Sequence, residues 1–299
     1  MHARPNRKYF STGRGATWLN VVSDRVMGLG GIVMPGTLRD SLGILDAVFN
    51  LDTRERPEIV ITDTGSYSDL VFGLFAICGY QFSPRIADIS DARLWRFDMS
   101  ANYGPLEPVS RHRVQAERIR QHWEDMLRVA GSLQTGKVRA YDLLRMMMAS
   151  GDRMTGLGDA FAHYGRIFKT LHLLQYLDSE AYRRMIGVQL NIGEGRHSLG
   201  RRIFFGRLSE LRHGYRDGME DQLGALGLAL NAVVWWNTLY TDAAVKKLEA
   251  GGVTISPEIR SRLSPLVHEH INFHGRYPII RFHSDGALRP LREPGESEE

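Results

Sequence analysis

The chain has 299 residues, of which 43% are hydrophobic and 24% are charged. This balance excludes a disordered or fibrous protein and is typical of a globular chain with one large core or two smaller cores. The 38 Lys and Arg residues against 34 Asp and Glu residues give a formal net charge of +4. Such a charge tolerates a polyanionic partner without demanding one.

The single cysteine, Cys78, excludes an internal disulfide framework and a cysteine-rich zinc site. The basic first residues lead into no apolar signal core, and no later segment approaches the ~20 apolar residues that cross a bilayer. We therefore expect a cytoplasmic protein without a membrane partner.

The first 95 residues predict a mixture of strands and helices. The strings WLNVV and GGIVM predict two adjacent antiparallel strands within 16–35. A capping-box-like start at Thr37 and helical spacing predict a helix to about Leu51. The apolar run EIVITD predicts a strand buried on both faces, which ends at Asp63. A second helix over 69–78 and a short strand over 85–89 are expected to follow.

Beyond Pro105 the pattern is helical. The periodic segments are 113–133, 140–148, 156–177, 180–205, 219–248 and 257–263. The tail over 284–299 has the composition of a solvated, disordered end.

Asp63 is the first candidate for a chemical role. An acid after a buried strand lies where open α/β sheets place their ligands. Two other interpretations remain open at this point. Asp63 could cap a turn through Thr64 and Gly65, or the D-T-G string could form a phosphate loop of a phosphotransferase that binds ATP.

Glu194 lies in NIGEGRHSLGRRIFFG. The two glycines beside it weaken a helix, so something other than helix propensity must explain this stretch. Basic residues surround it, and a cationic surface of this kind suits phosphates, although a solvated helix face is the commoner outcome. In the later string HEHINFHG, His270 and His274 have a spacing that metal sites use, but a structural role is favoured. Trp235 and Trp236 are expected to pack in a core.

Taken in order, several strings resemble the C-terminal domain of the replicative transposases of the Tn3 family. They are KYFSTGRGATWLN, SDR, IVMPGTLRDSL, ITDTGSYSDLVFGLFAICGYQFSPRIADI, NIGEGRHSLGRRIFFG and EHINFHGRY, and they run from about Lys8 to Tyr277. The resemblance implies an α+β fold, with an incomplete RNase H-like core, a large helical insertion and a helical C-terminal part. Its expected parts are 1–95 (the front of the core, without its first strand), 96–180 (the insertion), 181–283 (the helical part with the last acid) and 284–299 (the tail).

The resemblance also implies a catalytic triad of Asp, Asp and Glu that holds Mg²⁺ or Mn²⁺. Asp63 matches its second acid and Glu194 its third, so both are expected to be catalytic metal ligands. The first acid belongs to an S-x-D-G-like string upstream of KYFSTGRGATW and has no match here. Asp24 matches a different family position and does not replace it.

The expected function is therefore that of a DNA transposase catalytic domain, which cleaves and joins DNA strands, in a truncated and inactive copy. The alternative is a non-catalytic fragment that binds DNA or a transposase and competes with the full-length enzyme. Expected partners are transposon ends, target DNA, and further copies or full-length transposase, with the protein on the nucleoid when it is bound. The candidates for phosphate contacts, chosen by charge and closeness to the motifs, are Arg14, Arg39, Arg196, Arg201 and Arg202.

Overall fold

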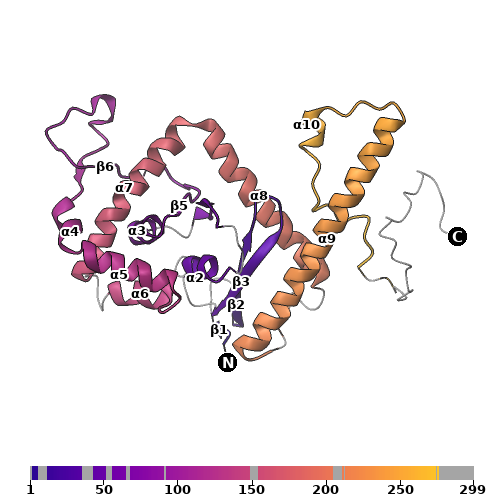
Figure 1. The fold of residues 1–299 in the computed structure, drawn as a ribbon, viewed down its shortest axis with the longest axis horizontal. Coiled ribbons are helices and arrows are strands. Elements are labelled where there is room, and N and C mark those ends of the chain that lie inside the picture. Colours follow the sequence, from indigo (N-terminus) through magenta and orange to yellow (C-terminus); the bar gives the residue numbers. More distant parts are fainter. Residues whose placement is uncertain are drawn as a thin grey trace.

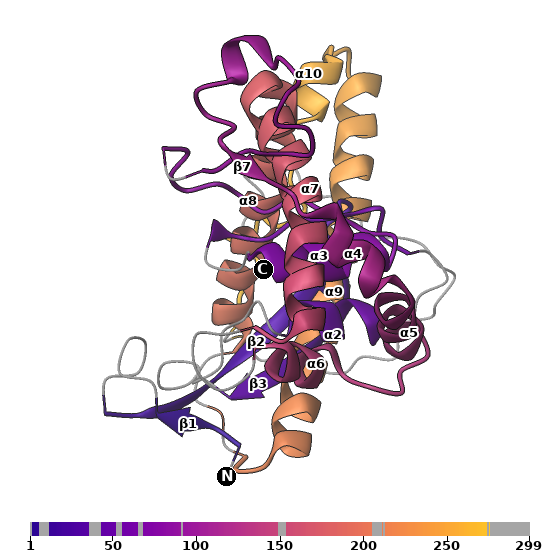
Figure 2. The ribbon, with the colours of Figure 1, turned by 90° about the vertical axis from the view of Figure 1, so that its left-hand side faces the viewer.

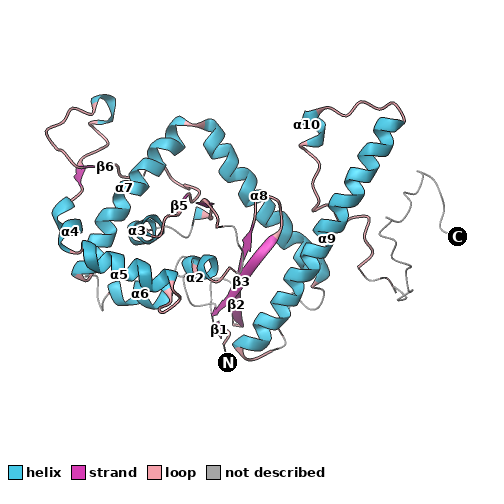
Figure 3. Ribbon diagram, viewed as in Figure 1, coloured by secondary structure: helices cyan, strands magenta, loops and turns pink. Residues whose placement is uncertain are grey.

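The computed structural model describes residues 2–5, 12–35, 43–51, 56–64, 68–90, 92–148, 154–204, 211, 213–273 and 275. Helices dominate these residues, and the strands are short apart from one hairpin (Figure 3). The strands are β1 (Arg4–Pro5), β2 (Arg14–Val22), β3 (Gly28–Pro35), β4 (Ile59–Val60), β5 (Gln81–Phe82), β6 (Trp95–Arg96) and β7 (His112–Arg113). The helices are α2 (Ile44–Phe49), α3 (Asp69–Ile77), the 3₁₀ turn η3 (Gly104–Leu106), α4 (Ala116–Gln121), α5 (Trp123–Gln134), α6 (Ala140–Met147), α7 (Gly156–Asp178), α8 (Glu180–Ile203), α9 (Arg216–Ala250) and α10 (Pro257–Arg260).

The hairpin of β2 and β3 confirms the two antiparallel strands expected within 16–35. Leu19 pairs with Ile32, and β1 extends the sheet on the other side of β2. At the turn, Ser23 donates its backbone N–H to the carbonyl of Met27 at 2.8 Å. Val26 has a φ of 68°, a left-handed conformation that a β-branched side chain rarely adopts. This turn therefore needs support from other parts of the molecule.

The strand expected in EIVITD forms, but only Ile59 and Val60 pair as β4, in parallel with β5. The strand expected over 85–89 is wrong, because the pairing strand is β5 at 81–82. Alternate residues of this segment donate to the segment of β4: the Gln81 N–H to the Glu58 carbonyl at 3.0 Å, the Ser83 N–H to the Val60 carbonyl at 2.9 Å, and the Arg85 N–H to the Thr62 carbonyl at 2.9 Å. The contact between the two segments therefore lies at 81–85 and not over 85–89.

The helices expected from periodicity are confirmed in α3 and α6 to α10, with ends shifted by a few residues. The segment 113–133 differs, because the backbone at His122 (φ −109°, ψ 10°) breaks it into α4 and α5. The helix expected over 37–51 is described only as α2, since 36–42 lie outside the described residues.

The largest hydrophobic cluster joins α2, α3, β5, α5, α6 and α7. Phe72, Phe75 and Leu74 of α3 are almost completely buried in it. Gly73 of α3 faces Gly165 of α7, so the two helix backbones pass in direct contact. This cluster spans residue 95, where the sequence suggests a boundary, so segments from both sides share one core.

On the other side of the hairpin, α9 packs along β3, where Val33 forms a small cluster with Met219 and Leu223 (Figures 1 and 2). The side chain of Asn231 binds the free edge of β3: its Oδ1 accepts from the Gly28 N–H at 2.8 Å, and its Nδ2 donates to the Gly28 carbonyl at 2.9 Å. Helix α9 thus occupies the edge of the sheet that β2 leaves open.

The α+β class is confirmed. The RNase H-like arrangement and the expected domain bounds stay predictions, because the described strands lie in three separate sheets of three, two and two strands. The tail over 284–299 lies outside the described residues. None of the described helices combines the length and apolarity that a bilayer crossing requires.

Candidate active site and DNA-facing residues

Asp63 lies in the connection between β4 and α3 and is exposed. Its Oδ1 accepts the backbone N–H of Thr64 at 2.7 Å, which is the local contact that the turn-capping interpretation predicts. Within the described chain, Oδ2 has no hydrogen-bond partner. The carboxylate therefore retains the capacity to bind a cation as well as its local contact.

Glu194 lies on α8 and is exposed, whereas Arg196, two positions later and about 200° around the helix, is completely buried. The helix continues through both glycines of the motif. Gly195 has a packing explanation, since a Cβ there would meet Leu266 Cδ1 at 2.8 Å. Gly193 has open space around it.

A buried polar network places the start of α8 against β5. The Tyr182 hydroxyl lies 2.6 Å from Ser83 Oγ and 3.0 Å from His172 Nδ1. The other ring nitrogen of His172 lies 3.0 Å from the Pro84 carbonyl. Because β5 pairs with β4, the first turn of α8 lies beside the sheet that contains the strand before Asp63.

Glu194 itself lies 12 residues after Tyr182 (194 − 182), about 18 Å further along the helix. The structure thus brings the two elements together at one end of α8. Convergence of the two carboxylates on one metal cluster stays a prediction.

Because of this network, we expect the free energy of unfolding to fall in acid as His172 becomes protonated. Burial lowers the pKa of His172 to about 4, against the hydrogen bond to Pro84, which raises it. The folded state favours the neutral ring. The contribution of His172 to the free energy of unfolding is therefore complete above the pKa of the unfolded chain, about 6.5, and is lost as the pH falls toward about 4. A shift of this size corresponds to about 3 kcal/mol.

We expect urea unfolding to show this loss in the wild type, and the His172→Gln variant, which has no titrating group at this position, to show a flatter pH profile. The lowered pKa of His163 acts in the same direction and is common to both proteins. Equal pH slopes for the two proteins would exclude His172 as a source of the effect.

The arginines expected to contact phosphates divide into two groups. Arg196 is inside the protein: its guanidinium donates to the Val26 carbonyl at 3.1 Å and to the Gly227 carbonyl at 3.5 Å. Burial lowers its pKa to about 10, which still leaves it charged at neutral pH. The expectation that Arg196 contacts a phosphate at the surface is therefore wrong. Its side chain instead joins α8 to the turn at Val26 and to α9. A charge pattern alone cannot distinguish a buried arginine from a solvated one.

Arg201 and Arg202, in the last turn of the same helix, are exposed, as is Arg14 at the start of β2. Arg39 lies outside the described residues. Contacts of these four arginines with DNA stay predictions.

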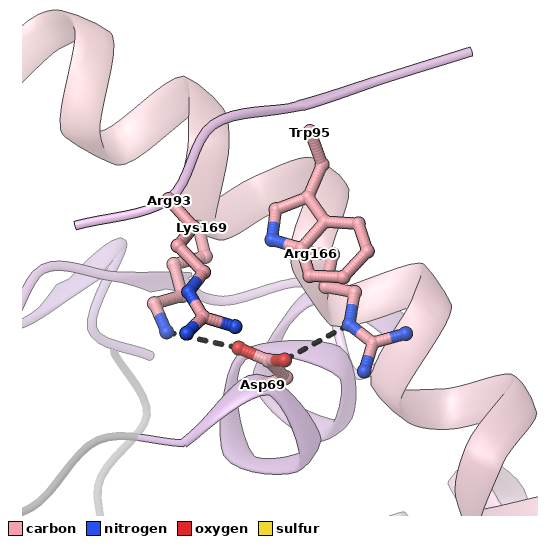
Figure 4. Close-up of a pocket in the computed structure, with 5 residues that line it drawn as sticks. All are labelled: Asp69, Arg93, Trp95, Arg166 and Lys169. Atoms are coloured by element: carbon pink, nitrogen blue, oxygen red, sulfur yellow. Dashed lines mark hydrogen bonds and ion pairs between the residues drawn. The ribbon is translucent and has the colours of Figure 1, made fainter. Parts of the chain in front are cut away.

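A cationic cavity that the sequence analysis missed opens at the N-terminus of α3 (Figure 4). It has a volume of about 610 Å³ and is lined by Asp69, Arg93, Trp95, Arg166 and Lys169. Asp69 lies between the cations, with Arg166 Nε at 3.0 Å and Lys169 Nζ at 2.9 Å. These residues come from three separate segments, so no local pattern in the sequence announces the cavity.

The aromatic and histidine residues near the end of the chain have mixed outcomes. Trp235 and Trp236 are exposed, so their expected place in a core is wrong. His270 is structural, as favoured: its Nε2 lies 3.0 Å from Asn237 Oδ1, and its ring stacks on Trp236. His274 lies outside the described residues. In the part of the chain that is described, no group of three or more His, Cys, Asp or Glu side chains is placed to hold a metal ion.

Comparison with known proteins gives a consistent result. The family model described as "Tn3 transposase DDE domain" matches residues 1–277. The chain is 53% identical to the transposase for transposon Tn4556 of Streptomyces fradiae, over 98% of this chain and 33% of that protein. It is 50% identical to the transposase for transposon gamma-delta of Escherichia coli (strain K12), over 91% of this chain and 27% of that protein. No solved structure matches the chain.

The chain thus spans a third or less of the length of these relatives. The family match extends from the β1–β3 sheet to the segment after α10 and includes both Asp63 and Glu194. The chain therefore belongs to the Tn3 transposase DDE domain family.

Proposed function

We propose that this chain supplies the catalytic part of a DNA transposase, for metal-dependent strand cleavage and strand transfer. The observation that carries the proposal is the family match over residues 1–277. It includes the carboxylate that follows β4 and the carboxylate of α8. The ATP-binding alternative has no comparable support, because the relatives are transposases.

The donor chemistry of the two acids fits the proposed ions. Carboxylate oxygens are ligands that Mg²⁺ and Mn²⁺ prefer, and both Asp63 and Glu194 are exposed to solvent. When bound, a pair of such ions would stabilise charge on the attacking and leaving oxygens of a displacement at phosphorus. The two residues would hold and orient the ions, and in the described part of the chain no third acid completes the group.

DNA is the proposed partner, both as transposon ends and as target. Exposed arginines near the motifs, Arg14, Arg201 and Arg202, are proposed to contact the backbone phosphates. Contacts of this kind position the strand without reading its sequence, so binding by this chain should be weakly selective and should fall steeply with salt. Association with further copies or with full-length transposase belongs to the same proposal.

A second candidate function follows from the incomplete set of acids. With two of the three family acids matched, the chain would bind DNA or a transposase without cleaving, and would compete with a full-length copy. Binding without cleavage distinguishes this function from catalysis.

The experiment measures Mn²⁺ binding by electron paramagnetic resonance and strand nicking on a labelled DNA that carries transposon ends. We expect weak Mn²⁺ binding by the purified chain, a reduction of about tenfold or more in Asp63→Asn and Glu194→Gln, and no nicking. Glu124→Gln on α5 is the matched control, because Glu124 is also an exposed acid and lies outside the proposed site.

Mn²⁺ binding that neither variant changes would contradict the metal-ligand roles. Metal-dependent nicking by the wild type that disappears in Asp63→Ala or Glu194→Ala would contradict the expected inactivity, and would show that another acid completes the site.

A further inference from the structure

We propose that the cationic cavity at the N-terminus of α3 binds a phosphate group of the DNA backbone. The inference rests on the proposed function, and it assigns a phosphate site that lies apart from the arginines of the α8 motif. The five lining residues, Asp69, Arg93, Trp95, Arg166 and Lys169, are those drawn in Figure 4.

The charge balance of the cavity favours an anion. Three cations line it, and Asp69 is the one acid among its lining residues. The carboxylate of Asp69 neutralises one positive charge, which leaves a net charge of about +2 in a space of about 610 Å³. In a partly enclosed site such charges attract an anion more strongly than they would on an open surface.

Two of the cations are held in place before any ligand binds. The side chain of Arg166 is 18% exposed; besides its bond to Asp69, its guanidinium lies over the Trp95 ring at 4.2 Å and contacts His163. The Lys169 side chain is 21% exposed and binds the other oxygen of Asp69. Cations that are already ordered lose little conformational entropy on binding a phosphate.

Arg93 differs from the other two cations. It approaches from the segment before β6, is exposed, and makes no hydrogen bond or ion pair with the part of the chain that the structure describes. A structural role, an ion-pair bridge between α3 and α7, is enough to account for the positions of Asp69, Arg166 and Lys169 without any ligand. It does not explain a third cation at the same cavity, and a phosphate ligand does.

The position of the cavity suits a strand that passes the candidate active site. Asp69 follows Asp63 by six residues (69 − 63), which limits their separation to roughly 20 Å. A DNA strand that is bound in the cavity through a backbone phosphate could therefore continue past the Asp63 carboxylate. Trp95 is not a platform for a base, because the Arg166 guanidinium lies over its ring and the tilted His112 ring lies 4.8 Å from it. The Trp95 ring instead positions Arg166.

The test is fluorescence anisotropy of the full chain with a labelled duplex over a series of salt concentrations, without divalent metal. We expect Arg93→Gln to weaken binding and to reduce the slope of log K against log salt by about 1, as the loss of one phosphate contact does. Lys246→Gln is the matched control. It removes the same charge from an exposed site on α9, and we expect the wild-type slope.

Asp69→Asn separates the two roles of the cavity, because it removes the competing carboxylate. A phosphate site predicts tighter DNA binding by this variant. A purely structural bridge predicts a lower melting temperature and no gain in affinity. Should Asp69→Asn fail to fold, Arg93→Gln decides alone, since Arg93 is exposed and makes no hydrogen bond or ion pair with the described residues.

Identical titrations for wild type, Arg93→Gln and Lys246→Gln would overturn the phosphate site while leaving DNA binding intact. Absence of DNA binding by the wild type would also overturn it. The metal-binding roles of Asp63 and Glu194 are measured without DNA, so failure here and failure of the proposed catalytic site are distinguishable.

Discussion

Gly165→Ala is expected to abolish the native fold. In the α7 backbone, a Cβ at this position would overlap the Asp69 carbonyl and would lie 2.6 Å from the Gly73 N. Both of these atoms belong to the backbone of α3, which cannot turn aside as a flexible side chain can. The two helices would have to separate, and α3 contributes several almost completely buried residues to the main core. We expect a loss of more than about 4 kcal/mol, comparable with the whole stability of many domains.

Gly187→Ala on α8 is the matched control, because a Cβ there meets nothing within 4 Å. It should stabilise the protein by up to about 1 kcal/mol through helix propensity alone. Circular dichroism and urea unfolding of the two variants measure the contrast. A Gly165→Ala protein with wild-type stability would show that α3 and α7 do not cross as closely as described.

The second large effect is expected for Arg196→Ala. This change removes two hydrogen bonds from a charged donor and leaves the carbonyls of Val26 and Gly227 without these partners. It also removes a large, fully buried side chain. We expect a loss of about 3 kcal/mol or more, since hydrogen bonds to charged groups and the packing of the stem both contribute. The Val26 carbonyl would lose its hydrogen bond to α8, and, among the described residues, only the bonds from Gln189 to the carbonyls of Val22 and Ser23 would still join this helix to the turn.

Arg196→Met tests which contribution dominates. It fills much of the same space and removes the cost of burying a charge, so we expect a smaller loss of about 1 kcal/mol. Arg201→Gln on the exposed part of the same helix should leave the free energy of unfolding within about 0.5 kcal/mol of the wild type. If Arg196→Ala weakened DNA binding at unchanged stability, a surface role for Arg196 would have to replace the structural one.

Local patterns were sufficient to predict much of the fold. Helices α7, α8 and α9 follow from the 3.6-residue period of their apolar residues, and the β2–β3 hairpin from its β-branched strings. These elements are determined by residues close to one another in the sequence. The strand expected over 85–89 was wrong, because the pairing lies at 81–82 and is set by β4, 22 positions earlier (81 − 59).

The candidate site could be predicted only in part, because its geometry depends on contacts between distant segments. Asp63 and Glu194 stand out through their motifs, but no local pattern places one relative to the other. The burial of Arg196 depends on Gly227, 31 positions later. The ion pairs of Asp69 in the cationic cavity join residues 97 and 100 positions apart. Such residues look like ordinary surface charges until the helices are packed.

The bonds between Asn231 and Gly28 have a further consequence for aggregation and assembly. An open strand edge is a template on which another chain can add a strand. At Gly28, the first residue of β3, that edge is covered, because the Asn231 amide imitates a neighbouring peptide group, both as donor and as acceptor. A second copy could add a strand at this point only after α9 had moved away. Assembly of this domain through the faces and ends of its helices is therefore compatible with the fold as it stands, whereas growth of its sheet at the start of β3 requires the Asn231 bonds to break.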